Sequence, residues 1–334
     1  MFHADELMAQ TLAGVSTRST AIHNFMTEQH RDFFATLPHI LVATSTTDGW
    51  PLATLLESDP GFVESTDPAT LRIRALPRSG DPAAGMLCLG DEVGILGIDL
   101  QTRRRNRANG IISGVDAAGF TIAVHQSFGN CPQYIQRRTL SRAPSMPGHV
   151  REFDSLADED ARTLIARADT FFVASRSRAG VGAAGGSDIS HRGGRTGFVH
   201  VKCDTLSIPD FRGNRYFNTL GNLLGEPRAS LLFINFETGA LLQLQGLGTI
   251  DWNMTAIQQY EGAERIWRFK VRRGWYRERA AELRGAFVDF SPVTLRTDRR
   301  GTHNSGFPSR CALQEHPLLT STVGARPPSD LSSV

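Results

Sequence analysis

The stretch ASLLFINFETGALLQLQGLGTI, Ala229–Ile250, has an earlier counterpart in VGILGIDLQTRRRNRANGII, Val93–Ile112. Similar residues recur 136 positions apart in the pairs Leu96 and Leu232, Asp99 and Asn235, Thr102 and Thr238, Gly110 and Gly246. GFVESTDPATLRI from Gly61 and GFVHVKCDTLSI from Gly197 have the same offset. A constant offset over separate blocks predicts two tandem copies of one domain.

The repeat sets the expected domain organisation. We expect an N-terminal helical lead-in at 1–29, a first copy at 30–140, a linker at 141–157, a second copy at 158–295, and a partly disordered C-terminal extension at 296–334.

Each copy is predicted to be mainly β. Short runs of Val, Ile, Leu and Phe alternate with turn sequences such as TTDG at Thr46–Gly49 and ETG at Glu237–Gly239. Short strand–turn–strand connections favour an antiparallel β-barrel with few helices over a βαβ sheet. Helices are expected over Thr27–Leu37 and Asp158–Ala168, and a short one over Thr219–Pro227 that Asn218 or Thr219 caps.

Composition narrows the function classes. The 334 residues are 40% hydrophobic and carry a formal net charge of +2, so a large core is expected and neither nucleic acid nor an anionic membrane is a required partner. No secretory leader or membrane span is apparent. Four scattered cysteines without a CxxC pair argue against a disulfide framework or a zinc site and favour the cytoplasm.

Two glycine-rich motifs follow each other in the second copy. GVGAAG, Gly180–Gly185, has the spacing of a dinucleotide fingerprint, but a polar and then strand-like sequence follows it where that fingerprint requires a helix. SHRGGRTGFV, Ser190–Val199, places Arg192 and Arg195 around a glycine pair. We interpret it as an anion-binding loop, with a solvated hairpin loop as the alternative.

IPDFRGNRYFNTLGNL, Ile208–Leu223, adds a helix N-terminus. Asn218, Thr219 and the amides of Gly221 and Asn222 are expected to form a phosphate site there. The first copy lacks this element, so we expect one such site per chain.

Two motifs of the first copy stay open. Arg103, Arg105 and Arg107 share one face of a predicted strand, which would meet the second copy, a ligand or solvent. Cys131 in SFGNCPQYIQRR is a packed residue or a reactive thiol.

These motifs together resemble FMN-binding split-barrel proteins related to pyridoxamine 5′-phosphate oxidase. The resemblance spans about residues 30–290 and rests on SFGNCPQYIQRR, SDISHRGGRTGFV, LSIPDFRGNRYFNTLGNLLGEPRASLLFINF and LLQLQGLGTI. It implies two split barrels forming an internal pseudo-dimer, with FMN between them. The C-terminal Arg-x-His element of the vitamin oxidase has no match in Asp298–Leu319, so vitamin B6 oxidation is not expected.

The resemblance also implies a set of cofactor residues. The phosphate would contact the loop and helix residues, and Ser190 and Gln243 would lie near the flavin ring. The full set is Ser190, Arg192, Gly193, Gly194, Arg195, Asn218, Thr219, Leu220, Gly221, Asn222 and Gln243 from the second copy, with Gln126, Ser127 and Asn130 from the first. No metal ligand and no catalytic side chain is assigned.

The function expected from these features is an FMN-dependent oxidoreductase acting on a small molecule, with NAD(P)H as a candidate electron donor and a homodimer as an open question. A non-catalytic flavin or haem binder is the alternative, for which His125, His191 and His200 are the open axial ligands. The third hypothesis is a nucleic-acid or protein interaction module that uses Arg103–Arg107.

Overall fold

The computed structural model describes residues 2–18, 20–146, 148–252 and 260–297. The expected C-terminal extension therefore lies outside the described residues except for Arg296 and Thr297. Within the described part, no helix is long and apolar enough to cross a membrane.

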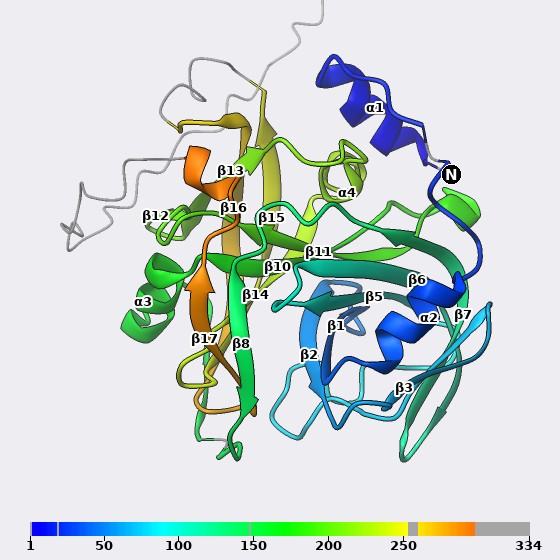
Figure 1. The fold of residues 1–334 in the computed structure, drawn as a ribbon. Helices are drawn as coiled ribbons and strands as arrows, with labels where there is room; N and C mark the ends of the chain where they lie inside the picture. Colours follow the sequence, from blue (N-terminus) through cyan, green and yellow to red (C-terminus); the bar gives the residue numbers. More distant parts are fainter. Residues whose placement is uncertain (1, 19, 147, 253–259, 298–334) are drawn as a thin grey trace, which may run out of the picture. The chain divides into compact units, whose positions relative to one another are not determined.

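Two sheets with the same strand order form the molecule (Figure 1). The first has the order β2-β1-β5-β6-β7-β4-β3, and the second has β11-β10-β14-β15-β16-β13-β12. The first sheet's strands are β1 (His39–Ser45), β2 (Pro51–Glu57), β3 (Val63–Asp67), β4 (Thr70–Ile73), β5 (Glu92–Asp99), β6 (Arg104–Asp116) and β7 (Gly119–Gly129). The second sheet's strands are β10 (Thr170–Arg176), β11 (Ser187–Gly193), β12 (His200–Lys202), β13 (Thr205–Phe211), β14 (Arg228–Ile234), β15 (Leu241–Asp251) and β16 (Ala263–Arg277).

The strand registers confirm the duplication. Val93 pairs with Gly110 in the first sheet, and Ala229 pairs with Gly246 in the second. Both sheets have a register shift at the same place, between Asn109 and Gly110 and between Gln245 and Gly246. A β-bulge is a specific local feature, so its recurrence 136 residues later identifies these strands as equivalent.

One apolar cluster lies inside each copy and a third is shared. Ile40 and Val42 of β1 point into the first copy's own core, whereas Leu41 and Ala43 join Phe172, Ala174 and other residues of the second copy. Because side chains alternate along a strand, β1 and β10 each pack on both faces. The two copies thus form an internal pseudo-dimer.

Three further strands join the copies. β8 (Arg137–Arg142) and β17 (Leu283–Asp289) form a two-stranded ribbon. β9 (Val150–Phe153) lies in the expected linker 141–157 and pairs with β16, so that segment is part of the second sheet.

The α-helices in the described residues are α1 (Ala4–Leu12), α2 (Glu28–Ala35), α3 (Glu159–Arg167) and α4 (Asn218–Gly225), with 3-10 turns at Gly182–Ala184 and Thr294–Arg296. Three of these four, α2, α3 and α4, begin within one residue of their predicted starts, and α1 lies in the expected helical lead-in. Thr27 caps α2 by accepting from the His30 amide, and Asp158 caps α3 by accepting from the Ala161 amide. The expected cap of α4 is wrong: Phe217 holds that place in left-handed backbone, with φ +61°.

The cysteines differ from expectation at one position. Cys88 and Cys131 are free, whereas Cys203 is disulfide-bonded. The compartment of the protein therefore stays a prediction.

Candidate functional site

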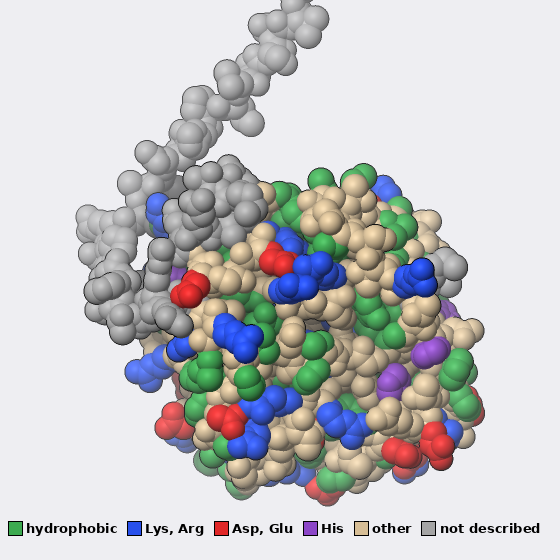
Figure 2. Space-filling view, turned by 45° about the horizontal axis from the view of Figure 1, so that its top comes forward, with side chains coloured by type: hydrophobic (Ala, Val, Ile, Leu, Met, Phe, Trp, Pro, Cys, Tyr) green, Lys and Arg blue, Asp and Glu red, His purple; other side chains and the backbone are tan. Residues whose placement is uncertain are grey.

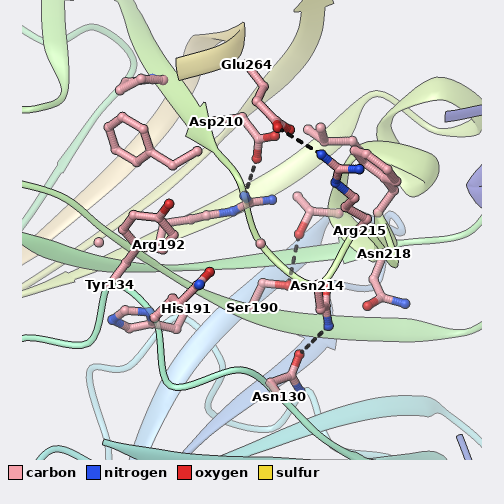
Figure 3. Close-up of a pocket in the computed structure, with 18 of the residues that line it drawn as sticks. Asn130, Tyr134, Ser190, His191, Arg192, Asp210, Asn214, Arg215, Asn218 and Glu264 are labelled. Atoms are coloured by element: carbon pink, nitrogen blue, oxygen red, sulfur yellow. Dashed lines mark hydrogen bonds and ion pairs between the residues drawn. The ribbon is translucent and has the colours of Figure 1, made fainter. Parts of the chain in front are cut away.

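A cavity of about 100 Å³ lies where the two copies meet, and we call it the arginine cavity. Arg105 and Arg107 reach it from β6 of the first copy, and Arg192 reaches it from β11 of the second. The segment after β13 and the start of α4 close another side (Figure 3). Its walls are Arg105, Arg107, Asn130, Gln133, Tyr134, Ser190, His191, Arg192, Gly193, Phe198, Pro209, Asp210, Phe211, Gly213, Asn214, Arg215, Phe217, Asn218, Thr219, Leu220, Glu264 and Arg265.

Positive charge exceeds negative charge around this cavity. Five arginines line it, and the carboxylates on its wall are Asp210 and Glu264. Asp210 pairs with Arg192 and also with Arg265, at 3.2 Å, and Glu264 pairs with Arg215 at 3.3 Å. The two carboxylates on the wall therefore form ion pairs with three of the five arginines. The other two, Arg105 and Arg107, have other partners.

Arg105 lies in an environment that disfavours its charge. Burial, together with the neighbouring charges of Arg107 and Arg192, lowers the pKa of its guanidinium to about 9. Its polar partners are neutral: the Cys131 carbonyl at 3.0 Å and the His191 ring at 3.1 Å. An anion in the cavity would relieve this repulsion.

His191 is neutral in this setting, because burial and the charge of Arg105 lower its pKa well below the ordinary value. Arg105 donates to its Nδ1, so the ring proton lies on Nε2. That Nε2 has no hydrogen-bond partner among the described residues.

Arg107 connects the cavity to a buried polar network. Its Nη2 donates to Ser190 Oγ at 2.5 Å, and its Nη1 lies 3.2 Å from Asp188 and 3.3 Å from Asn218. Asp188 also accepts from Asn109, at 2.6 Å. From the sequence, Arg105 and Arg107 were expected on one strand face, in contact with a ligand, the second copy or solvent. The alternation of side chains along a strand was the signal that placed them together.

Besides His191 Nε2, four buried donors on residues that line the cavity lack partners in the described ranges. They are Arg107 Nε, Arg192 Nε, Arg215 Nε and Asn130 Nδ2. Buried N–H groups are costly when unpaired, so such a cluster favours an oxyanion that accepts several hydrogen bonds.

Half of the predicted cofactor residues lie together at this cavity. Its walls include Ser190, Arg192, Gly193, Asn218, Thr219, Leu220 and Asn130. The predicted residues outside its walls are Gly194, Arg195, Gly221, Asn222, Gln243, Gln126 and Ser127.

Arg195 and Gly194 support the loop instead. Arg195 donates to the carbonyls of Leu295 and Thr297, at 2.7 and 2.9 Å. Gly194 donates its amide to Asp169 and accepts from Gln136.

The predicted cofactor residues on β7 and β15 do not lie together, and each contacts a different part of the protein. Gln126 donates to the Ala184 carbonyl at 2.9 Å, beside a second hollow described below. Ser127 Oγ lies 2.9 Å from the His30 ring. Gln243 is fully buried on β15, where it donates to Asp81.

Helix α1 covers the α4 residues that the sequence assigned to phosphate. Glu6 accepts from Asn218 Nδ2, and His3 Nε2 lies 3.0 Å from Asn222 Oδ1. A Cβ on Gly221 would lie 2.7 Å from Glu6 Cα, so this glycine permits the close approach of the two helices. The Gly221 amide is also committed, to the Phe217 carbonyl at 2.6 Å.

α1 has a polar inner side and an apolar outer side. Glu6 and Gln10 are buried, whereas Leu7, Met8 and Leu12 are about half exposed. Burial and the nearby charge of Asp188 raise the pKa of Glu6 to about 8. At neutral pH the helix therefore presents mainly a protonated carboxyl to α4.

The arginine cavity has a filled counterpart, which residues of both copies form. By strand register, Gln243 and Arg277 correspond to Arg107 and Asn130, and Thr54 corresponds to Ser190. There the Asp81 carboxylate accepts from Thr54 and Arg277, both at 2.6 Å, and from Gln243 at 3.1 Å. The chain thus supplies its own anion at one of the two equivalent places.

Comparisons with known proteins concern the fold. No family model and no curated protein matches the chain. Three solved structures are similar to parts of it. An FAD-binding protein from Mesorhizobium loti is 11% identical over 39% of this chain and 97% of its own, with a TM-score of 0.28. HupZ from Group A Streptococcus is 14% identical over 38% and 98%, with a TM-score of 0.30.

The third is a general stress protein 26-related protein of the pyridoxinephosphate oxidase family from Clostridium acetobutylicum. It is 14% identical over 39% of this chain and 92% of its own, with a TM-score of 0.24. The pyridoxinephosphate oxidase family, which the printed name of this third protein gives, is of the kind that the sequence motifs resemble. Each match spans about the length of one copy, and the duplication itself rests on the strand orders and registers above.

Proposed function

We propose that this chain binds FMN and holds the phosphate of the flavin in the arginine cavity. The observation that carries the proposal is a set of buried donors without partners in the described part of the chain, on four residues that line this cavity: Arg107, Arg192, Arg215 and Asn130. A phosphate offers three strongly accepting oxygens to such donors.

The size of the cavity fits the phosphate rather than the whole cofactor. Sites for complete small-molecule ligands measure roughly 300–1,000 Å³, whereas this cavity measures about 100 Å³. We therefore propose that the phosphate is held here and that the flavin ring extends beyond the cavity. When bound, the flavin would supply the electron-transfer chemistry, while the arginines fix its phosphate and exclude water.

The first experiment is an absorbance spectrum of the purified, concentrated protein, followed by release and identification of any chromophore. Flavin bands and released FMN are expected. A Soret band would replace the proposal with haem binding. A colourless protein that takes up no added FMN would contradict it.

The two arginines of the glycine–arginine loop provide a matched pair of variants. Arg192→Ala is expected to weaken FMN binding more than tenfold, because it removes a charged hydrogen-bond donor worth about 1.5–3 kcal/mol. Arg195→Ala is expected to leave the dissociation constant within about twofold, because Arg195 bonds only backbone carbonyls in the described residues. Fluorescence titration with FMN measures both, and equal losses in the two variants would contradict the assignment.

We further propose that the flavoprotein is an oxidoreductase for a small-molecule substrate, with NAD(P)H as candidate electron donor. Anaerobic mixing with NADH or NADPH is expected to bleach the flavin, and air is expected to restore it over repeated cycles. A flavin that stays oxidised with both donors would favour the non-catalytic binding role.

A further inference from the structure

A second hollow, of about 430 Å³, lies between the copies, and we call it the glycine hollow. One wall is the connection between β10 and β11, residues 177–186, which contains the GVGAAG motif. The other wall comes from β5, β6 and β7 of the first copy, through Glu92, Asn109 and neighbouring residues. This volume lies within the range of sites that hold small molecules, roughly 300–1,000 Å³.

The corresponding place in the other half is filled. By strand register, Trp50 and Arg228 correspond to Gly186 and Glu92. The Arg228 guanidinium lies 5.8 Å from the centre of the Trp50 ring, so these two large side chains occupy their space together. Gly186 has a φ of +123°, and a Cβ built on it would meet nothing within 4 Å. The chain thus keeps one of these two equivalent spaces open and fills the other.

Two nearly fully buried side chains on the walls of the hollow have unused hydrogen-bonding capacity. Asn109 is 5% exposed and donates through Nδ2 to Asp188, which leaves its Oδ1 without a partner in the described residues. Ser187 is 3% exposed, and its Oγ has no partner in those ranges either. In the filled counterpart, Gln245 instead donates to the Pro51 carbonyl at 3.1 Å.

The charges at the rim are paired with each other. Arg176 faces Glu92 at 3.5 Å, and Arg178 faces Asp5 at 3.0 Å. Paired charges leave no net attraction for an ion, so a neutral ligand suits the hollow better than a charged one.

The walls favour a flat ligand. Gly186 faces open space and allows a ring to approach the backbone closely, and Ile111, 36% exposed on β6, offers an apolar surface. The unpaired oxygen acceptors on Asn109 and Ser187 match an aromatic ring that carries N–H donors.

We propose that the glycine hollow is a second ligand site, which takes a neutral, planar heteroaromatic molecule bearing N–H donors to Asn109 Oδ1 and Ser187 Oγ. This site is distinct from the arginine cavity and does not depend on what that cavity binds.

Nicotinamide is a suitable probe, and methyl nicotinate is its matched control, because the ester keeps the ring and neutral charge but lacks the N–H donors. Calorimetric titration of the full chain is expected to show saturable nicotinamide binding that is about tenfold tighter than ester binding. Equal affinities for the two probes, or no nicotinamide binding up to its solubility limit, would overturn the proposal.

Variants on one strand locate the site. Ile111→Trp is expected to abolish nicotinamide binding by filling the hollow. Val115→Trp, on the same strand but outside the hollow and also partly exposed, is expected to leave it unchanged. Ser187→Ala should weaken binding about fivefold without loss of thermal stability, since its Oγ has no partner in the described residues.

The same titrations separate this proposal from the proposed FMN site. Ile111→Trp is expected to bind FMN like wild type, whereas Arg192→Ala should bind nicotinamide like wild type. Nicotinamide binding that survives Ile111→Trp would overturn the glycine hollow alone. Failure of FMN to bind wild type would overturn the arginine cavity alone.

Discussion

Arg192 and Arg195 show how little sequence spacing says about a side chain's task. Both flank the same glycine pair, and both were expected to bind phosphate. Arg192 lies on β11, where its side chain reaches the cavity and pairs with Asp210. Arg195 follows the strand and donates to carbonyls about 100 residues later in the chain. The end of β11 at Gly193 separates the two roles.

Asp81 gives a prediction at the same scale. Its side chain is buried against Arg277, and Asp81→Ala would leave that guanidinium charged and unpaired. We expect a loss of about 3–5 kcal/mol in the free energy of unfolding, measured by denaturant titration, because one partner of a buried ion pair is removed.

Added anions test the reason for that loss. Formate or acetate is expected to restore part of the stability of Asp81→Ala by occupying the vacated carboxylate position. The double variant Asp81→Ala with Arg277→Met should lose less stability and should not respond to the anions. An equal anion response in wild type and in Asp81→Ala would contradict the account of Asp81 as a built-in anion.

At the scale of elements, α1 is the least expected helix. Glu6 is buried against α4, whereas Leu7, Met8 and Leu12 are about half exposed, the reverse of an ordinary surface helix. Only a polar surface could accept this inner side, and α4 provides one through Asn218 and Asn222. The helix therefore covers residues that the sequence suggested for a ligand.

The docking of α1 should depend on pH through Glu6. The charges facing it are Asp188, which raises its pKa, and Arg107, which lowers it, with burial as the largest effect. Because the docked pKa of about 8 exceeds the ordinary 4.5, docking is strongest below pH 4.5 and weakens as pH rises to about 8. Hydrogen exchange of the α1 amides, corrected for intrinsic rates, is expected to accelerate over this range.

Glu6→Gln is the control for that measurement. The amide side chain stays neutral, so its α1 protection should be nearly constant between pH 5 and 9. The same pH dependence in Glu6→Gln and in wild type would show that another group controls the docking.

At the scale of the whole molecule, the two copies depend on each other. The shared apolar cluster includes Leu41 and Leu96 of one copy and Phe172 and Leu232 of the other, all almost fully buried. The face in Figure 2 has basic and acidic side chains interspersed among uncharged ones, with no extended surface of one sign. The shared apolar cluster therefore joins the two copies into one folded unit.

Division of the chain tests this dependence. Residues 1–146 and 148–334 expressed together are expected to copurify as one complex with a single thermal transition, because the shared cluster and the β8–β17 pairing hold them. The 1–146 fragment alone should aggregate or self-associate, since its share of the cluster would be exposed. A well-folded, monomeric 1–146 fragment in sedimentation analysis would contradict this view.

The β architecture was predictable because its signals are local. Apolar runs separated by turn residues specify strands, and a repeated block predicts a repeated fold, as the matching bulges at Gly110 and Gly246 confirm. The residues of the candidate site were predictable in part, since Ser190, Arg192, Asn218 and Thr219 line one cavity; that they bind a cofactor stays a prediction.

The sequence by itself thus determined the β class, the two copies and the motif-bearing strands, because periodicity and turn chemistry act over a few residues. Only the tertiary structure decided which member of each pair of equivalent places stays open. The two pairs are the arginine cavity with its counterpart and the glycine hollow with its counterpart. Asp81 fills the counterpart of the arginine cavity through its contact with Arg277, and Trp50 fills the counterpart of the glycine hollow through its contact with Arg228. The partners in these contacts are about 180 to 200 positions apart in the chain. Such contacts arise from the packing of one copy on the other. No local sequence pattern encodes which side chain will occupy a given place between the copies.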